Sequence, residues 1–357
     1  MLAQRYPTVY DGIAAGAPAI YWPELFASMQ WAEVFMNSIG EYPHLCELNA
    51  LTEAAVKKCD GLDGAVDGVI GDVDACLGKF DPFKAVGQPV NCSIPGAPAT
   101  ISKTAAAVAN ATWNGPIEAN GRRIWYGLDP GADINGQGPY SPPGGTSGLA
   151  TTRCVDGKCS AVTFPLADFW VRYFVARDPT FKVGNITRAQ YESLTRFARQ
   201  EYRSIATDFA DLYEFRQAGG KLVTYHGLVS LPLRSTSRTR AVTNTTEADP
   251  IVPPKGTTHY HEAVRTLMSD TNGFYRHYDI PGMAHCFGGP SGQPESLFSQ
   301  LRAWVENGTA PGSSPVNLMV ANQTHHRILC PYPQKAKFDK KCGDTAAGKC
   351  WGCQGKL

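Results

Sequence analysis

The second half of the chain alternates between short strand-like runs and amphipathic helices. Residues 221–227 and 274–280 are rich in aliphatic, aromatic and β-branched side chains and end at glycine or Pro-Gly, which predicts two strands. Residues 257–268 and 295–306 carry apolar side chains at helical spacing, and Gly308 caps the second helix. This alternation predicts a parallel sheet with helices on its faces. The expected apolar stripes are Tyr260, Ala263, Val264 and Leu267 in the first helix, and Leu297, Leu301, Trp304 and Val305 in the second.

The first half is predicted to contain helices separated by long loops. We expect helices over 22–39 and 101–113 and a buried helix over 165–176. Residues 8–20 form a short apolar segment of small residues, whereas 80–160 are rich in Gly, Pro and Ser and are expected to be mostly loop. The side chains expected to be buried in the third helix are Leu166, Phe169, Trp170, Tyr173 and Phe174.

Composition excludes several classes of protein. Apolar residues make up 43% and charged residues 18% of the 357 positions, which favours a folded chain of two domains, or one domain with an insertion. The 33 basic and 32 acidic side chains leave a net charge of +1 without a basic stripe, so we expect no nucleic-acid partner. No apolar run approaches the roughly eighteen residues that a membrane span needs, so we expect no membrane partner. The pattern carries no signal for an oligomeric state.

Cysteines and glycosylation sequons point to export. Eleven cysteines are rare in cytosolic proteins outside metal sites, and together with the sequons they favour a secreted, disulfide-bonded glycoprotein. Residues 1–7 lack the charged and apolar regions of a signal peptide, so we expect either unconventional export or a chain without its true beginning. The six Asn-x-Ser/Thr sequons are Asn91, Asn110, Asn185, Asn244, Asn307 and Asn322.

Two loops carry residues suited to acid–base chemistry. His285 follows the second predicted strand among glycines that leave its imidazole accessible, which suits a general base. Asp249 stands before a proline-rich segment that leads into a helix. Each also has an ordinary interpretation, as a surface histidine and as an aspartate that begins a turn. An Asp loop followed by a His loop matches the chain order Ser, Asp, His of α/β-hydrolases, and this order favours catalysis for both.

An acidic segment predicts a calcium site. Asp60, Asp63 and Asp67 recur with glycines that permit a tight coil, and clustered carboxylates are the hard oxygen ligands that Ca²⁺ prefers. The spacing is not that of an EF-hand, and the alternative is an acidic, solvated loop. Cys59 and Cys76 bracket the segment and are expected to pair.

Other cysteines also suggest disulfides. Cys154 and Cys159 are placed to pair across a small turn, and Cys46 and Cys92 are then left to each other. Near the C-terminus two further bridges have three possible connectivities. These four cysteines are Cys330, Cys342, Cys350 and Cys353.

The sequence resembles the fungal tannase and feruloyl esterase family of serine esterases. Six stretches from the first residues to the last carry the resemblance, among them PGMAHCFGG and CDGLDGAVDGVI. It implies an α/β-hydrolase catalytic domain with a large inserted lid, and a Ser-His-Asp triad acting on esters of phenolic acids. It also implies a disulfide between the Cys before the nucleophile and the Cys after the His. The stretches are 3–19, 59–70, 125–134, 249–264, 281–289 and 329–338.

The resemblance assigns roles to residues and boundaries to domains. His285 would be the base, Asp249 its orienting acid and Cys286 the bridging cysteine. A structural Ca²⁺ in the lid would be held by five residues. The catalytic domain would comprise 1–20 and 206–320, the lid 21–205, and a Cys-rich segment 321–357. The calcium ligands would be the side chains of Asp60, Asp63 and Asp67 and the main-chain carbonyls of Ala65 and Val69.

The chain departs from the family pattern where the nucleophile belongs. The family carries a Gly-Cys-Ser-x-Gly-Gly elbow before the stretch at which this chain begins, and no replacement G-x-S-x-G occurs in the sequence. We therefore expect an α/β fold with a partial α/β-hydrolase sheet, its first strands missing, and a large inserted lid. The fragment is expected to be inactive, with Cys286 lacking its partner. The alternatives are a non-catalytic, calcium-binding secreted remnant and an incomplete gene model.

Residues 229–247 form a second departure. The family runs almost directly from the His-Gly strand end to the Asp, and Leu228 would join Ala248 in that way if these nineteen residues were removed. Val-Ser at the start can be encoded by GTAAGT, a splice donor, and Thr-Glu at the end can finish in AG. We interpret the segment as a retained intron. The alternative is a genuine surface loop, whose closure costs little entropy even when it is long.

Overall fold

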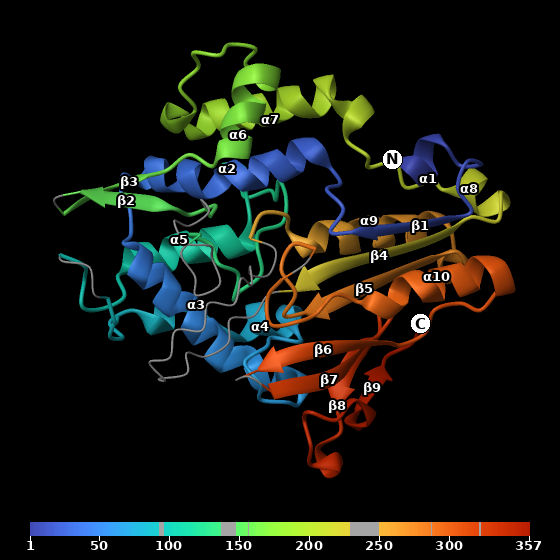
Figure 1. Cartoon of the computed structure of the whole chain (residues 1–357). Coiled ribbons are helices and arrows are strands. Elements are labelled where there is room, and N and C mark those ends of the chain that lie inside the picture. The colour runs from blue at the N-terminus through green and yellow to red at the C-terminus, as the bar shows by residue number, and fades with distance from the viewer. Residues whose placement is uncertain (93–95, 137–147, 156, 229–249, 287, 321–322) are drawn as a thin grey trace.

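The computed structural model contains a three-stranded parallel sheet, formed by one strand from the start of the chain and two strands from its second half (Figure 1). The structure describes residues 1–357 except 93–95, 137–147, 156, 229–249, 287 and 321–322. The strands are β1 (Gly12–Gly16), β4 (Lys221–Leu228) and β5 (Tyr275–Pro281), in the order β1-β4-β5. The register pairs Gly12 with Lys221 and Leu222 with Tyr275. The predicted strands and their parallel arrangement are confirmed.

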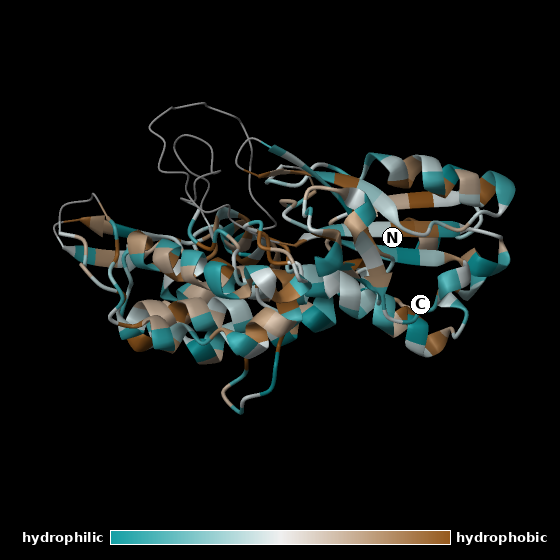
Figure 2. Ribbon diagram, turned by 90° about the horizontal axis from the view of Figure 1, so that it is seen from below, coloured by the Kyte–Doolittle hydropathy of each residue, from teal (hydrophilic) through white to brown (hydrophobic). Residues whose placement is uncertain are grey.

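The two predicted helices cover opposite faces of this sheet. Alternate residues of a strand point to opposite faces, so Leu222 and Val223 enter different cores. Leu222 packs with α9 (Pro254–Leu267), and Val223 packs with α10 (Glu295–Asn307). Figure 2 shows the hydrophobic positions of the strands between helices with hydrophilic outer faces. The sheet is therefore covered as a buried parallel sheet requires.

The predicted stripes of these helices are correct except near the C-terminal ends. Tyr260 and Val264 are buried, but Leu267 is 63% exposed, and the next residue, Met268, packs in the core in its place. The fully buried His261 takes the inward position that the apolar pattern did not indicate. In α10, Leu297, Leu301 and Trp304 are buried, whereas Val305 is 36% exposed. Gly308 caps α10 in the left-handed conformation, as predicted.

Helices dominate the segment between β1 and β4. The predicted helices are confirmed as α2 (Trp22–Ile39) and α5 (Lys103–Asn114), which pack with α3 (Leu45–Cys59) around one large core. A second core joins α2 to α7 (Arg188–Glu201). The chain enters this helical unit at Tyr21 and returns beside it, since the Tyr21 N–H donates to the Ala206 carbonyl at 2.8 Å. Smaller elements are α1 (Leu2–Arg5), α4 (Val73–Lys79), α8 (Tyr213–Gln217) and the hairpin of β2 (Thr152–Val155) and β3 (Lys158–Ala161).

The segment 165–176 is helical as predicted, but most of the side chains that were expected to be buried are exposed. It consists of α6 (Pro165–Phe169) followed by a π-helical turn, Trp170–Val175. Trp170 is buried and stacks on Phe26 with ring centroids 4.7 Å apart. Burial is confined to Ala167, Trp170, Val171 and Val175, so one face alone of this segment is covered. The exposed members of the predicted set are Leu166, Phe169, Tyr173 and Phe174.

The C-terminal segment folds into two antiparallel β-pairs. The pairs are β6 (Ser314–Val320) with β7 (Gln323–Leu329), and β8 (Lys335–Phe338) with β9 (Trp351–Gln354). In the described part of the chain, no helix is both long and apolar enough to cross a membrane.

Five disulfides take ten of the eleven cysteines. The expected pairs Cys59–Cys76, Cys154–Cys159 and Cys46–Cys92 are all present. Of the three connectivities open near the C-terminus, the structure has Cys330–Cys353 and Cys342–Cys350. The antiparallel pairing of β8 with β9 places Cys353 opposite Ala336, near Cys330. This pairing selects one of the three connectivities.

Candidate functional site

His285 lies on a tight loop directly beyond β5, at the carboxyl end of the parallel sheet. The loop packs against the end of β4, where the Gly282 N–H donates to the Leu228 carbonyl at 2.6 Å. A Cβ on Gly227 would lie 2.2 Å from the carbonyl oxygens of Met283 and Ala284, so only glycine permits this approach. His285 itself is half-buried. The position is the one at which parallel α/β sheets place their chemistry.

Glycines and short hydrogen bonds shape the His285 loop. Gly282 and Gly289 have φ values of +79° and +81°, and the Ala284 N–H donates to the Gly288 carbonyl at 2.9 Å. Cys286 is half-buried, and the Gln293 amide donates to its carbonyl at 3.1 Å. The loop is therefore held by its backbone, which leaves the imidazole to be oriented by its neighbours.

The partner predicted for His285 lies outside the described residues. Asp249 and the segment 229–247 both fall in the range 229–249, so the structure does not test the triad pair or the intron interpretation. The structure does bring together the end of β4, from which that segment departs, and the loop that carries His285.

The acidic segment forms a compact, buried loop. Asp60, Asp63 and Asp67 are 3%, 2% and 5% exposed. The carboxylate of Asp60 accepts from the N–H groups of Asp67 and Gly68, at 2.9 and 3.0 Å. Asp63 accepts from the Ala65 N–H at 3.1 Å. The alternative of a solvated acidic loop is therefore wrong, because the carboxylates point into the protein.

The charge inside the loop is only partly neutralised. Arg327 of β7 makes ion pairs with Asp63, at 3.4 Å, and with Asp67. Three carboxylates share one ion-pair partner, and the charge of Lys337, whose ammonium bonds to the Leu62 carbonyl, also acts on Asp63 without an ion pair. Two negative charges of the loop therefore have no ion-pair partner among the described residues. Burial raises the pKa values of Asp60 and Asp63 above the usual range, although Arg327 opposes the shift. An uncompensated, buried pair of negative charges is costly, and a divalent cation would balance it.

The main chain of the loop also offers oxygen ligands. Ala65 and Val69 are each 1% exposed, and no hydrogen bond within the described part of the chain reaches their carbonyl oxygens. Buried carbonyls are ordinarily paired, so these two fit a cation ligand set together with the three carboxylates.

The carboxylate oxygens are nevertheless not drawn together as in a closed metal site. Among described residues, three His, Cys or acidic ligand atoms all lie within 4.8 Å of one another only at His44, Cys46 and Cys92. Both of those cysteines are bound to each other in a disulfide, which removes them as metal ligands.

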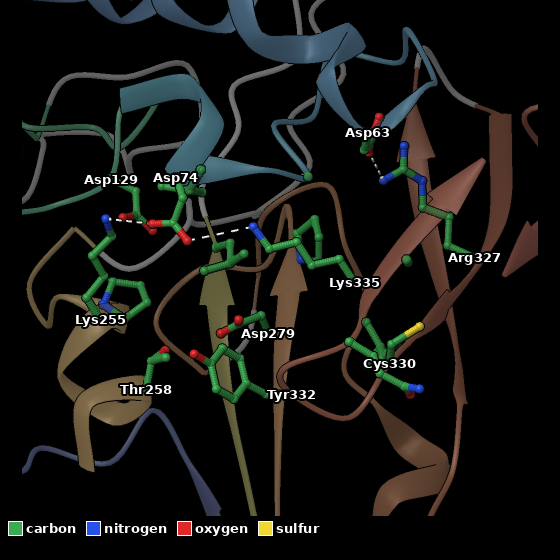
Figure 3. A pocket seen from close by; sticks show the side chains of 18 of the residues that line it. Asp63, Asp74, Asp129, Lys255, Thr258, Asp279, Arg327, Cys330, Tyr332 and Lys335 are labelled. Atoms are coloured by element: carbon green, nitrogen blue, oxygen red, sulfur yellow. Dashed lines mark hydrogen bonds and ion pairs between the residues drawn. The ribbon is translucent and has the colours of Figure 1, made fainter. Parts of the chain in front are cut away.

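A cavity of about 340 Å³ lies between the helical unit, the sheet and the C-terminal strands (Figure 3). Lys255 of α9 pairs with Asp74 at 2.9 Å, and Lys335 of β8 reaches Asp74 at 3.7 Å and Asp72 at 2.7 Å. Burial raises the pKa of Asp72, but the hydrogen bond and charge of Lys335 outweigh this, so its pKa lies below the usual value.

Further acidic groups that line this cavity are paired with neighbouring side chains and are therefore not free to bind a substrate. Asp279 pairs with His277 at 3.1 Å, and Glu262 pairs with Arg265 at 2.9 Å. His285 is not among the lining residues. The cavity is therefore better described as a charged joint between structural units than as the reaction site. Sequence reasoning missed this joint, although the lysines of QKAKF, 334–338, lie in a stretch that carried the resemblance.

Buried histidines lie beneath α9. His226 bonds through Nδ1 to the Thr257 hydroxyl at 2.8 Å, and His277 bonds to Thr224 at 3.0 Å. Both ring nitrogens of the fully buried His261 lack a hydrogen-bond partner among the described residues. Burial, with a smaller contribution from His277 and Arg265, lowers the pKa of His261 to about 3.

Comparison with known proteins identifies the family. The profile described as "Tannase and feruloyl esterase" matches residues 1–350. A probable feruloyl esterase of Arthroderma benhamiae is 32% identical over 355 residues, which cover 96% of this chain and 60% of that protein. The tannase of Aspergillus oryzae is 25% identical, over 93% of this chain and 60% of that protein.

Solved structures agree. The tannin acyl hydrolase from Aspergillus niger superposes with a TM-score of 0.81 and 25% identity, covering 99% of this chain and 62% of that one. The chain thus spans about three fifths of the length of the relatives it matches. A match of this extent in sequence and in structure shows that the chain belongs to the tannase and feruloyl esterase family.

Proposed function

We propose that this chain is the larger part of a carboxylic ester hydrolase that acts on esters of phenolic acids. The observation that carries the proposal is the position of His285, on a glycine-shaped loop beyond β5 and against the end of β4. Family membership supports the reaction class, and the names of the relatives support tannin or feruloyl esters as substrates.

The proposed mechanism is acyl transfer through a serine. The serine hydroxyl attacks the ester carbonyl while His285 accepts its proton, and the His then protonates the departing alcohol. Water, deprotonated by the same His, releases the phenolic acid from the acyl-enzyme. Asp249 would hold the imidazole in the required tautomer and stabilise its protonated form.

The nucleophile is not among these 357 residues, because the sequence contains no G-x-S-x-G elbow. We therefore propose that the chain alone is inactive. The test is hydrolysis of methyl gallate and methyl ferulate by the 357-residue chain and by the polypeptide that the complete transcript encodes. Activity of the longer protein alone supports the proposal. Activity of the 357-residue chain would contradict it, and inactivity of both would favour a non-catalytic protein.

The helical unit between β1 and β4 would be the lid that shapes the substrate pocket. Export as a disulfide-bonded glycoprotein is supported by the five bridges and by the exposure of Asn91, Asn185 and Asn307 in their sequons. Asn110 is half-buried, and Asn244 and Asn322 lie outside the described residues.

Calcium is the proposed structural ion of the acidic loop. The side chains of Asp60, Asp63 and Asp67 and the carbonyls of Ala65 and Val69 would hold it, and its charge would balance the two uncompensated negative charges of the loop. A hard divalent cation supplies electrostatic cross-linking there and takes no part in ester hydrolysis. A non-catalytic, calcium-binding secreted protein is the second candidate function, and the same loop favours it.

Removing calcium is expected to destabilise the chain. At 100 times the dissociation constant, a ligand stabilises the folded state by about 2.7 kcal/mol, which corresponds to roughly 4 °C in Tm for a chain of this length. Differential scanning calorimetry in Ca²⁺ and in EGTA measures this difference. Asp60→Asn is expected to abolish it, whereas Glu53→Gln, which changes an exposed acid on α3, is expected to preserve it. Equal Tm values in both buffers would refute the calcium proposal.

A further inference from the structure

The acidic loop is enclosed by the C-terminal strands. Lys337 of β8 donates to the Leu62 carbonyl at 2.9 Å, and Ala65 packs in a small core with Cys350 and Trp351. Arg327 enters from β7 and contacts both Asp63 and Asp67. Residues more than 250 positions apart in sequence thus form one charged cluster.

Arg327 is buried with the carboxylates that it contacts. Its side chain is 4% exposed, and its guanidinium carbon lies 4.1 Å from the centre of the Trp351 ring, a cation–π distance. Its Nε has no hydrogen-bond partner among the described residues. A guanidinium stays charged at neutral pH, so Arg327 brings a full positive charge to the carboxylates that it contacts.

We propose that Arg327 is a resident counter-ion of the acidic loop, which holds the loop folded without metal and sets its affinity for a divalent cation. This inference rests on the calcium site proposed above. Arg327 neutralises one of the three buried carboxylates, and the loop therefore presents two negative charges to an entering ion. It belongs to a different structural unit from the loop, so it also ties the helical unit to the C-terminal strands.

Coulomb's law gives the direction of the effect. A fixed positive charge a few Å from a divalent cation repels it, and burial strengthens this repulsion because the surroundings screen it less than water does. Removing that charge is therefore expected to tighten cation binding. In the metal-free protein the same change removes the ion-pair partner of the buried Asp63 and Asp67, which among the described residues keep only backbone hydrogen bonds from Ala65 and Val69, and this is destabilising.

The test compares Arg327→Met with the parent 357-residue chain by calorimetric Ca²⁺ titration and by melting in EGTA. Methionine keeps the packing on Trp351 and removes the charge. We expect the Kd for Ca²⁺ to fall at least about tenfold and the Tm in EGTA to fall by roughly 5 °C. Arg327→Lys keeps the charge and is expected to bind Ca²⁺ within about threefold of the parent.

Lys255→Met serves as the matched control, because Lys255 pairs with Asp74 outside the ligand set. It is expected to leave the Kd nearly unchanged. If the parent binds Ca²⁺ and Arg327→Met binds it equally or more weakly, the counter-ion role is wrong and the calcium site stands. If no chain binds Ca²⁺, the calcium proposal is wrong and the inference fails with it.

Discussion

Replacing His285 by alanine is expected to lower kcat/KM for a phenolic ester by at least about a thousandfold in the polypeptide that carries the nucleophile. In the proposed mechanism, the imidazole is the group that accepts the serine proton during attack and returns it to the alcohol, and the variant lacks it. The residual rate would come from substrate binding and from electrostatic stabilisation of the oxyanion. Steady-state kinetics with methyl ferulate and methyl gallate measures the change.

His326→Ala is the matched control, because His326 is exposed on β7 and bonds to Asn317 at 2.8 Å, away from the His285 loop. It is expected to leave kcat/KM unchanged. The loop of His285 is held by backbone hydrogen bonds, so His285→Ala is expected to keep the parent Tm. A drop in kcat/KM of less than tenfold, with Tm preserved, would remove His285 from the catalytic machinery.

Acid is expected to destabilise the fold through His261, by about 2–3 kcal/mol between pH 6.5 and pH 4. The folded state lowers the pKa of this histidine to about 3, chiefly by burial, from the ordinary value of 6.5. Between these values the unfolded chain binds a proton that the folded chain excludes. The associated stability is thus complete above pH 6.5 and is lost as the pH falls towards 3, by up to about 1.4 kcal/mol per pH unit.

His261→Phe is expected to flatten this dependence. The phenyl ring keeps the aromatic contact with Tyr275, whose ring centre lies 4.7 Å away, and removes two buried nitrogens without partners. The measurement is the free energy of unfolding in urea from pH 4 to pH 7. Some acid sensitivity will remain because of Asp279. Burial raises the pKa of Asp279, but the charge and hydrogen bond of His277, with His226 and Lys335, together hold this pKa below its usual value, and protonation of Asp279 weakens its pairing with His277.

His326→Phe provides the comparison, since His326 is exposed and its replacement should leave the slope as it is in the parent. A parent chain whose unfolding free energy is constant from pH 6.5 to pH 4 would show that His261 does not carry this effect. An unchanged slope in His261→Phe would show the same.

Local patterns predicted the elements of the fold well. Helix 22–39 and the strands around β4 and β5 lie where the sequence placed them, because apolar periodicity and glycine caps act over a few residues. The errors are in burial. Leu267 and Phe169 are exposed although their helices have apolar periodicity. Local periodicity does not encode whether a helical face meets another element.

For the candidate sites, too, the sequence indicated the local features and missed the long-range contacts. The His285 loop and the acidic loop could be recognised because their chemistry lies within about ten consecutive residues. Arg327 and Lys337 could not, because they reach the acidic loop from strands more than 250 residues further along the chain. His261 was missed because a histidine within an amphipathic helix gives no sequence sign that its ring faces the core.

The sequence by itself determined the family, the α/β alternation, the place of His285 on a loop beyond a strand, and the acidic segment with its flanking disulfide. These features are encoded by residue types at short, regular spacing. Only the tertiary structure decided which C-terminal cysteines pair, which aromatic side chains are exposed, and that Arg327 shares the charge of the acidic loop. Those outcomes depend on side chains brought together by packing, and their energies arise from burial and charge that exist only once the chain has folded.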